Sequence, residues 1–227
     1  GRNKVSAFVK SPEPSLPDFD PNNILLWTYP DLHPSWTWPG REGENLEVIV
    51  YCAGDRAELF LNGASLGTKT TGRDSKYTAT WNVPYAPGEL KAIGYTDGRA
   101  ESEWVLKTAG PPAQLRLNVD RTEIVADGLD LSYVTVEVLD ANGVLVPQAE
   151  NLIRFVVQGQ GALAGVGNGK PYGTESFQRP RRTAFNGRCL VVLRSTLQPG
   201  TITLTASADG LDSDSVVVRA VARAPRP

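Results

Sequence analysis

The single histidine, His33, is the first residue to consider for catalytic chemistry. A Ser-His-Asp or Cys-His arrangement would have to use it. It lies, however, in the proline-rich sequence Asp31-Leu32-His33-Pro34, with no nucleophile motif such as G-x-S-x-G beside it. The sequence does not indicate a zinc site, because no cysteine or second histidine lies at ligand spacing from His33. We therefore interpret His33 as a half-buried structural residue and assign no catalytic residue, metal ligand or cofactor to this chain.

Carboxylates are the other candidates for chemistry, because a pair of them can hydrolyse a glycosidic bond. The 25 acidic residues mostly occupy expected turns or exposed strand faces. The turn positions are Asp55, Asp74, Asp97, Asp127, Asp140 and Asp209. Acidic side chains at turns usually hydrogen-bond to the backbone, so the sequence singles out no catalytic pair.

Two neighbouring stretches offer polar contact surfaces. Residues 159–169 are rich in glycine, but no helix follows them as a phosphate loop requires, so we expect a wide loop at one end of a sandwich. Further along, arginines gather near aromatic residues, a combination suited to a carboxylate, a polar ligand or a neighbouring domain. The candidates for this domain or ligand contact loop are Asn168, Tyr172, Arg181 and Arg182. A merely solvated loop is the alternative.

A cluster of aromatic residues near the N-terminus suggests carbohydrate contact. Tryptophan rings stack on the apolar faces of sugars, and their N–H groups can donate to hydroxyls. The candidate contacts are Trp27, Trp36, Trp38 and His33. The same rings also fit two other roles, as buried anchors of a linker or as a docking surface for a further domain. Solvent exposure of the rings distinguishes these roles.

The elements that position these residues are short strands. From about residue 44, β-rich runs alternate with turn dipeptides such as Asn62-Gly63 and Asp97-Gly98, and no helical periodicity extends beyond about two turns. The break at Gly110-Pro111-Pro112 marks a domain boundary. We therefore predict an all-β fold of two consecutive antiparallel immunoglobulin-like β-sandwiches.

The predicted organisation has four parts. Residues 1–40 form a Pro/Trp-rich connector, extended and irregular, that packs on the first sandwich. Residues 41–110 form the first sandwich, residues 111–222 the immunoglobulin-like second one, and residues 223–227 a tail. Cys52 and Cys189 each belong to a row of alternating apolar residues, so both are expected to be core thiols, with a disulfide bridge between the two domains as the alternative.

Composition excludes several classes of partner. The net charge of -2 argues against nucleic acid, and no apolar run approaches the ~20 residues that span a bilayer.

The sequence also contains no methionine. We therefore expect a chain that is processed or cut from a longer polypeptide.

Two sets of motifs carry a family resemblance. The first half contains Trp36-x-Trp38-Pro39-Gly40-Arg41-Glu42-Gly43 and Glu58-Leu59-Phe60-Leu61-Asn62-Gly63-x-Ser65-Leu66-Gly67. The second contains Gly165-Val166-Gly167-Asn168-Gly169 and Ala184-Phe185-Asn186-Gly187. In this order the motifs resemble the C-terminal β-sandwich modules of bacterial glycoside hydrolase family 2 enzymes of the β-galactosidase type.

The resemblance implies a parent enzyme that cleaves β-galactosides or related β-glycosides with two glutamates on a catalytic barrel. The barrel is absent here, so no catalytic residue carries over, and this part alone is expected to be inactive. The implied partners are the barrel of the same polypeptide and an oligo- or polysaccharide. The implied location is exported, periplasmic or extracellular. A second resemblance, to immunoglobulin-like spacers of bacterial adhesins, covers only residues 113–220.

Overall fold

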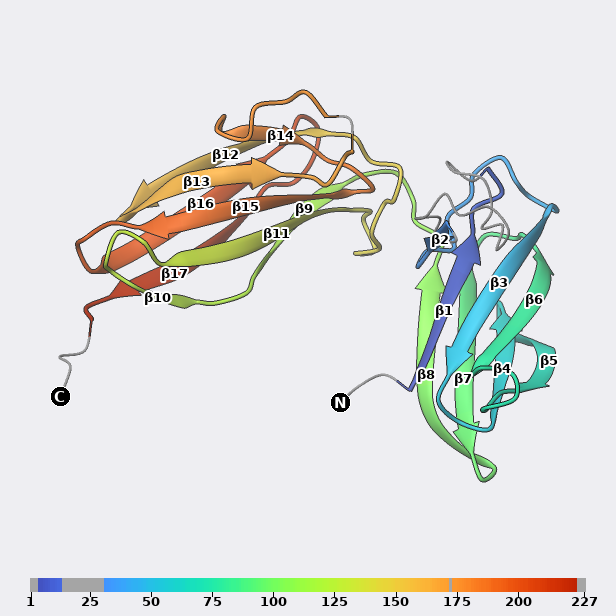
Figure 1. The fold of residues 1–227 in the computed structure, drawn as a ribbon. Helices are drawn as coiled ribbons and strands as arrows, with labels where there is room; N and C mark the ends of the chain where they lie inside the picture. The colour runs from blue at the N-terminus through green and yellow to red at the C-terminus, as the bar shows by residue number, and fades with distance from the viewer. Residues whose placement is uncertain (1–3, 14–30, 172, 224–227) are drawn as a thin grey trace, which may run out of the picture. The chain divides into compact units, whose positions relative to one another are not determined.

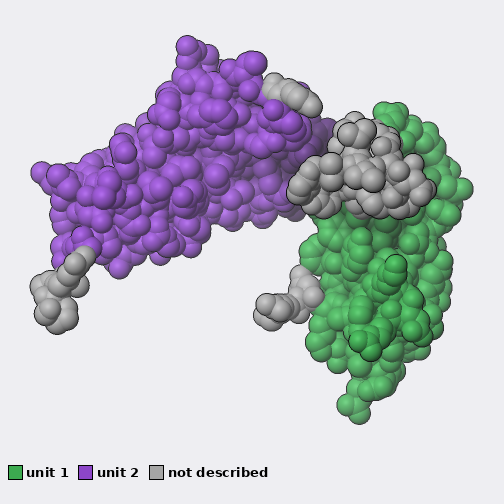
Figure 2. Space-filling model, viewed as in Figure 1, with its two compact units in different colours: residues 1–108 green, residues 109–227 purple. Residues whose placement is uncertain are grey.

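The computed structural model describes residues 4–13, 31–171 and 173–223 (Figure 1). The chain divides into two compact units, Gly1–Thr108 and Ala109–Pro227, which Figure 2 colours separately. Every regular element within the described residues is a β-strand. The prediction of an all-β chain with two consecutive sandwiches is therefore confirmed.

The first unit consists of two four-stranded antiparallel sheets. One has the order β2-β1-β3-β6, formed by Leu32–His33, Val5–Lys10, Asn45–Cys52 and Thr78–Pro84. The other has the order β5-β4-β7-β8, formed by Ala64–Thr70, Arg56–Leu61, Glu89–Thr96 and Arg99–Lys107. Alternate residues of both sheets enter one apolar core, which includes Val50, Leu59, Trp81 and Leu90. This alternation follows from the period of two along a strand.

The hairpin turns lie where the sequence predicts them. Asn62 and Gly63 have φ angles of 50° and 82° and join β4 to β5. Asp97 and Gly98 have φ angles of 50° and 79° and join β7 to β8. Two-residue turns with positive φ at both positions match the twist of the flanking strands, and Asn-Gly and Asp-Gly adopt them at low cost.

Strand β1 lies inside the segment for which the sequence predicts an irregular connector. Val5, Ala7 and Val9 are buried, and β1 pairs with both β2 and β3. The prolines that suggest an irregular segment begin only at Pro12, after β1 has ended. The alternation of apolar residues over positions 5–9 is therefore the local signal that indicates a strand here.

The second unit also contains two sheets. The larger has the order β10-β17-β16-β12-β14, formed by Glu123–Val125, Asp214–Val221, Gly200–Ser207, Leu152–Gly159 and Arg181–Thr183. The smaller has the order β13-β15-β11-β9, formed by Gly161–Gly167, Arg188–Ser195, Leu131–Leu139 and Gln114–Val119. The β10–β17 pair is parallel and the other strand pairs are antiparallel.

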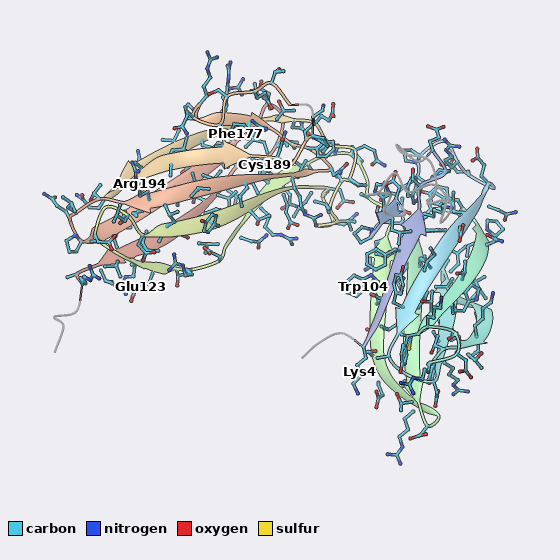
Figure 3. All side chains as sticks on the ribbon, in the orientation of Figure 1. Lys4, Trp104, Glu123, Phe177, Cys189 and Arg194 are labelled. Carbon is cyan, nitrogen blue, oxygen red and sulfur yellow. The ribbon has the colours of Figure 1, made fainter. Side chains whose placement is uncertain are left out.

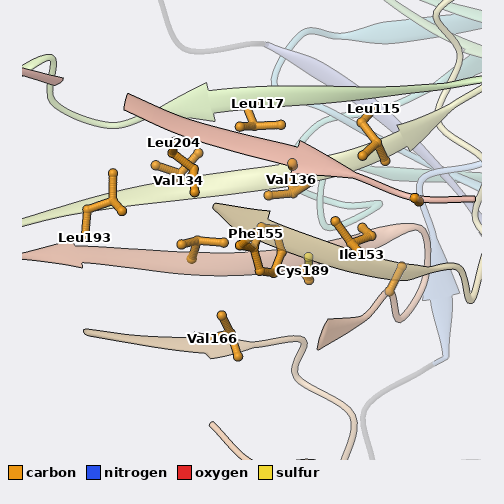
Figure 4. Close-up of a cluster of buried hydrophobic side chains, with 14 of the residues drawn as sticks. Leu115, Leu117, Val134, Val136, Ile153, Phe155, Val166, Cys189, Leu193 and Leu204 are labelled. Carbon is orange, nitrogen blue, oxygen red and sulfur yellow. The ribbon is translucent and has the colours of Figure 1, made fainter. Parts of the chain in front are cut away.

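Both sheets of the second unit contribute to one apolar core (Figure 4). Val134 and Val136 enter it from β11, and Phe155 from β12. Cys189 lies among them as a free thiol, and Cys52 is likewise a free, buried thiol in the first unit. The expectation that both cysteines are core residues is therefore confirmed.

The glycine-rich stretch is a strand, which corrects the prediction of a wide loop. Gly161–Gly167 form β13, and only the tight turn at Gly159, with a φ of 91°, breaks the sheet pattern before it. Glycine suits this strand because of close packing. A Cβ on Gly161 would lie 2.7 Å from the methyl groups of Ile202 on the opposite sheet. A register shift between Leu163 and Gly165 adds a bulge.

Candidate functional site

The aromatic candidates near the N-terminus separate into buried and half-buried residues. Trp36 is 0% exposed, and its Nε1 donates to the carbonyl of Ala86 at 2.9 Å. Its ring meets Tyr85 edge to face, with centroids 5.1 Å apart. Trp36 therefore has no free face for a sugar ring, which corrects the expectation of carbohydrate contact at this residue. It anchors its segment to the core instead.

Trp38 and His33 lie against each other. Their rings are perpendicular, with centroids 5.4 Å apart, and both are half-buried. His33 Nε2 lies 2.9 Å from Asp31 Oδ1, and Trp38 Nε1 donates to the carbonyl of Ser35 at 3.3 Å. Trp27, the remaining candidate, lies outside the described residues. The structure thus joins two of the four candidates and leaves part of each ring accessible.

The arginine loop of the second unit is built around one buried guanidinium. Arg182 is 1% exposed, and its Nη2 donates to Asn168 Oδ1 at 2.8 Å. Nη1 donates to the carbonyl of Glu175 at 3.0 Å. The guanidinium also lies 4.8 Å from the ring centroid of Phe177. Phe177 is labelled in Figure 3. Because Arg182 is covered, it is a framework residue and not itself a contact, which corrects the expectation for this position.

The exposed rim of the same loop carries the accessible charge. A shallow pocket of about 250 Å³ is lined by Thr174, Glu175, Ser176, Arg179 and Arg181. Arg179 and Arg181 are exposed, whereas Glu175 accepts a hydrogen bond from Thr183 Oγ1 at 2.9 Å. A lining that includes two arginines and two hydroxyl side chains suits a carboxylate or another acidic group. Tyr172 lies outside the described residues.

A polar cluster around a single carboxylate, which sequence reasoning missed, lies on the sheet β13-β15-β11-β9. Glu137 accepts from Arg116 Nη2 at 2.8 Å, from Arg188 Nε at 3.0 Å and from Asn118 Nδ2 at 3.1 Å. Burial disfavours the charged form, but these hydrogen bonds outweigh it and hold the pKa of Glu137 below its ordinary value. Its sequence signal was a charged residue within the apolar run of residues 131–139.

A Gly-x-Ser-x-Gly sequence does occur at residues 63–67, away from His33. In hydrolases with this motif the serine occupies a strand-to-helix turn. Here Ser65 lies in the edge strand β5, and its hydroxyl donates to Glu58 Oε1 at 2.6 Å. Ser65 therefore belongs to a β-hairpin and does not occupy the strand-to-helix turn that the hydrolase motif requires.

The described residues contain no group of three or more His, Cys, Asp or Glu side chains arranged to hold a metal ion. In the same part of the chain, no helix has the length and apolarity needed to cross a membrane.

A model of a known domain family matches part of each unit. Residues 115–217 match Glycoside hydrolase family 2 C-terminal domain 5. The chain belongs to this family, as a C-terminal module. Residues 43–101 match a Domain of unknown function (DUF4982). The family 2 match covers the same part of the chain as the adhesin resemblance, and so favours the hydrolase interpretation over the adhesin one.

Curated relatives extend over most of this family 2 chain. It is 45% identical over 184 residues to beta-galactosidase BoGH2A of Bacteroides ovatus, a match that covers 79% of this chain and 21% of that protein. It is 34% identical over 179 residues to a putative beta-glucuronidase of Formosa agariphila, covering 76% and 17% respectively. The chain thus spans about a fifth of the length of the curated relatives.

Solved structures agree with the sequence matches. A glycosyl hydrolase family 2 member from Bacteroides cellulosilyticus is 41% identical with a TM-score of 0.84, and the match covers 94% of this chain and 28% of that one. A beta-glycosidase from Bacteroides vulgatus is 29% identical with a TM-score of 0.79, covering 96% and 25% respectively. The chain therefore corresponds to a small part of larger family 2 polypeptides.

Proposed function

We propose that this chain is an ancillary, non-catalytic part of a glycoside hydrolase that acts on β-galactosides or related β-glycosides such as β-glucuronides. The observation that carries the proposal is the 45% identity to a beta-galactosidase over a match that covers 79% of this chain but 21% of that protein. Catalysis then belongs to a barrel elsewhere in the same polypeptide, and the two sandwiches support it.

The arginine loop is the surface that best suits contact with that barrel. Phe177 is 60% exposed and precedes the exposed Arg179 and Arg181 in the same loop, so the loop presents an apolar ring and two charges. The Arg182–Asn168 hydrogen bond beneath them holds the loop in one conformation. A preorganised patch with arginine and an aromatic residue has the composition typical of protein interfaces.

Activity measurements test the non-catalytic assignment. The purified 227-residue chain, with folding checked by circular dichroism, is assayed on chromogenic β-galactoside and β-glucuronide substrates. We expect no turnover, and we expect the longer polypeptide that contains this chain to cleave one of them. Turnover by the 227-residue chain would overturn the assignment.

Charge reversal tests the docking surface. Arg179→Glu combined with Arg181→Glu should leave the stability of the 227-residue chain unchanged, because both side chains are exposed. In the longer polypeptide the same pair should speed heat inactivation of the glycosidase. Arg219→Glu on the exposed face of β17 is the matched control. Equal inactivation rates for all three proteins would exclude this loop as the docking surface.

A further inference from the structure

A second aromatic surface lies on the outer face of the sheet β2-β1-β3-β6. In β3 the inward row is Val48, Val50 and Cys52, so Tyr51 points outward and is 39% exposed. Phe8 of β1 meets Tyr51 edge to face, with ring centroids 5.9 Å apart. His33 of β2 pairs with Val9, an inward position of β1, whereas Phe8 and Tyr51 occupy outward positions, so this surface is separate from the tryptophan cluster.

A shallow hollow of about 330 Å³ opens beside Tyr51. Its lining consists of Lys4, Ser6, Tyr51, Cys52, Ala53 and Tyr77. Tyr77 is 48% exposed and supplies a second ring, and Lys4 Nζ pairs with Glu101 Oε2 at 2.6 Å. We call Tyr51, Tyr77 and Ser6 the tyrosine platform. It presents two aromatic rings together with three hydroxyl groups.

The backbone holds Tyr77 in an unfavourable conformation. Lys76 and Tyr77 have consecutive φ angles of 53° and 59°, in the left-handed region that non-glycine residues avoid. The position is nevertheless fixed, because the Tyr77 amide donates to Gly72 O at 2.7 Å and the Cys52 amide donates to Tyr77 O at 2.9 Å. Strain of this kind is concentrated at binding sites, where it keeps a side chain ready for a ligand.

We propose that the tyrosine platform is a non-catalytic binding site for a pyranose ring of a β-linked oligosaccharide. A sugar ring has apolar C–H faces and a rim of hydroxyls, and the platform offers ring surface and hydroxyl partners in the same hollow. The choice of β-linked galactosides and glucuronides rests on the proposed function. The binding site itself stands on the geometry of Tyr51, Tyr77 and Ser6.

Amide-detected NMR of the 227-residue chain tests the proposal with two probes, a β-linked galactan oligosaccharide and an oligosaccharide that contains β-linked glucuronic acid. We expect saturable shifts at the amides of Ser6, Tyr51 and Tyr77, with a dissociation constant of about 1 mM for contact with one or two rings. Tyr77→Ala should weaken binding about tenfold, since it removes one stacking ring. Tyr133→Ala is the matched control, because Tyr133 is similarly exposed, at 42%, but lies in the second unit.

Each remaining outcome overturns the proposal. Absence of saturable shifts in the folded wild-type chain would exclude the site. Equal affinity of wild type and Tyr77→Ala would move binding elsewhere, and shifts that depend on protein concentration without sugar would identify the platform as a self-association surface. Circular dichroism, which reports both units, confirms that each variant is folded. Activity of the longer polypeptide is a separate readout, so a failure here leaves the proposed function intact.

Discussion

Replacing Glu137 with glutamine tests the electrostatic organisation of the second unit. The carboxylate is 8% exposed and accepts hydrogen bonds from Arg116, Arg188 and Asn118. Glutamine keeps the shape but removes the charge, and its amide turns an N–H₂ group toward at least one guanidinium. Hydrogen bonds to charged groups contribute about 1.5–3 kcal/mol each. Both arginines are half exposed, so water replaces part of the lost hydrogen-bond energy. We therefore expect the free energy of unfolding of the second unit to fall by about 2 kcal/mol at pH 7.

The pH dependence of this loss has a definite sign. The pKa of Glu137 is lowered in the folded state: burial alone would raise it, but the hydrogen bonds from Arg116 and Arg188 outweigh burial. Its stabilisation is therefore complete above the unfolded pKa of about 4.3 and disappears as the pH falls through the lower folded value. The difference between wild type and Glu137→Gln should shrink below about pH 4.

The distribution of tryptophans supplies an internal control for this measurement. All 5 tryptophans lie within residues 1–108, so tryptophan fluorescence reports only the first unit. Circular dichroism reports both units. In urea titrations Glu137→Gln should shift the dichroism transition of the second unit and leave the fluorescence transition in place. A loss that stays constant from pH 7 to pH 3, or no loss at pH 7, would refute the reasoning.

Three further substitutions and one labelling experiment have expected outcomes. Trp36→Ala should destabilise the first unit by about 3–5 kcal/mol, read from urea titration by tryptophan fluorescence, because it empties a fully buried site. Gly161→Ala should cost the second unit about 1–3 kcal/mol in dichroism-detected unfolding, because its Cβ would crowd Ile202 at 2.7 Å. Lys76→Gly should stabilise the first unit by about 0.5–1 kcal/mol, read by the same fluorescence titration. Glycine relieves the left-handed strain at φ 53°, and its larger conformational entropy in the unfolded chain offsets part of this gain. Burial raises the pKa of Cys189 to about 12, so a thiol reagent at pH 8 should label it only at the rate at which the second unit opens.

The strands and turns that the sequence predicts correctly share one property. Their signals are local, as in the alternation of residues 45–52 or the turn at Asn62-Gly63, and do not depend on what packs against them. β13 was predicted wrongly for the opposite reason. Gly161 is a strand residue because it pairs with Ser195 of β15, and it is a glycine because Ile202 of the other sheet approaches it closely. That contact lies beyond any local window.

The candidate sites were harder to predict than the fold, because residue type identified them and burial decided between their roles. Trp36 and Arg182 were selected as contact residues for their chemistry, and both are fully covered. Large amphipathic side chains serve equally well as anchors, and a sequence does not state what covers them. Arg181, next to the buried Arg182, is exposed because neighbours on a strand face opposite sides.

The same alternation would have identified Tyr51 from the sequence. Once Val48, Val50 and Cys52 are assigned to the core, Tyr51 must face outward, since it lies between two inward positions. The direction of a tyrosine between two inward strand positions is known, so it is more informative than a tryptophan in a loop of unknown burial. Strand alternation thus selects exposed aromatic residues more reliably than aromatic type alone, and the NMR titration at Tyr51 and Tyr77 tests whether that selection identifies a binding surface.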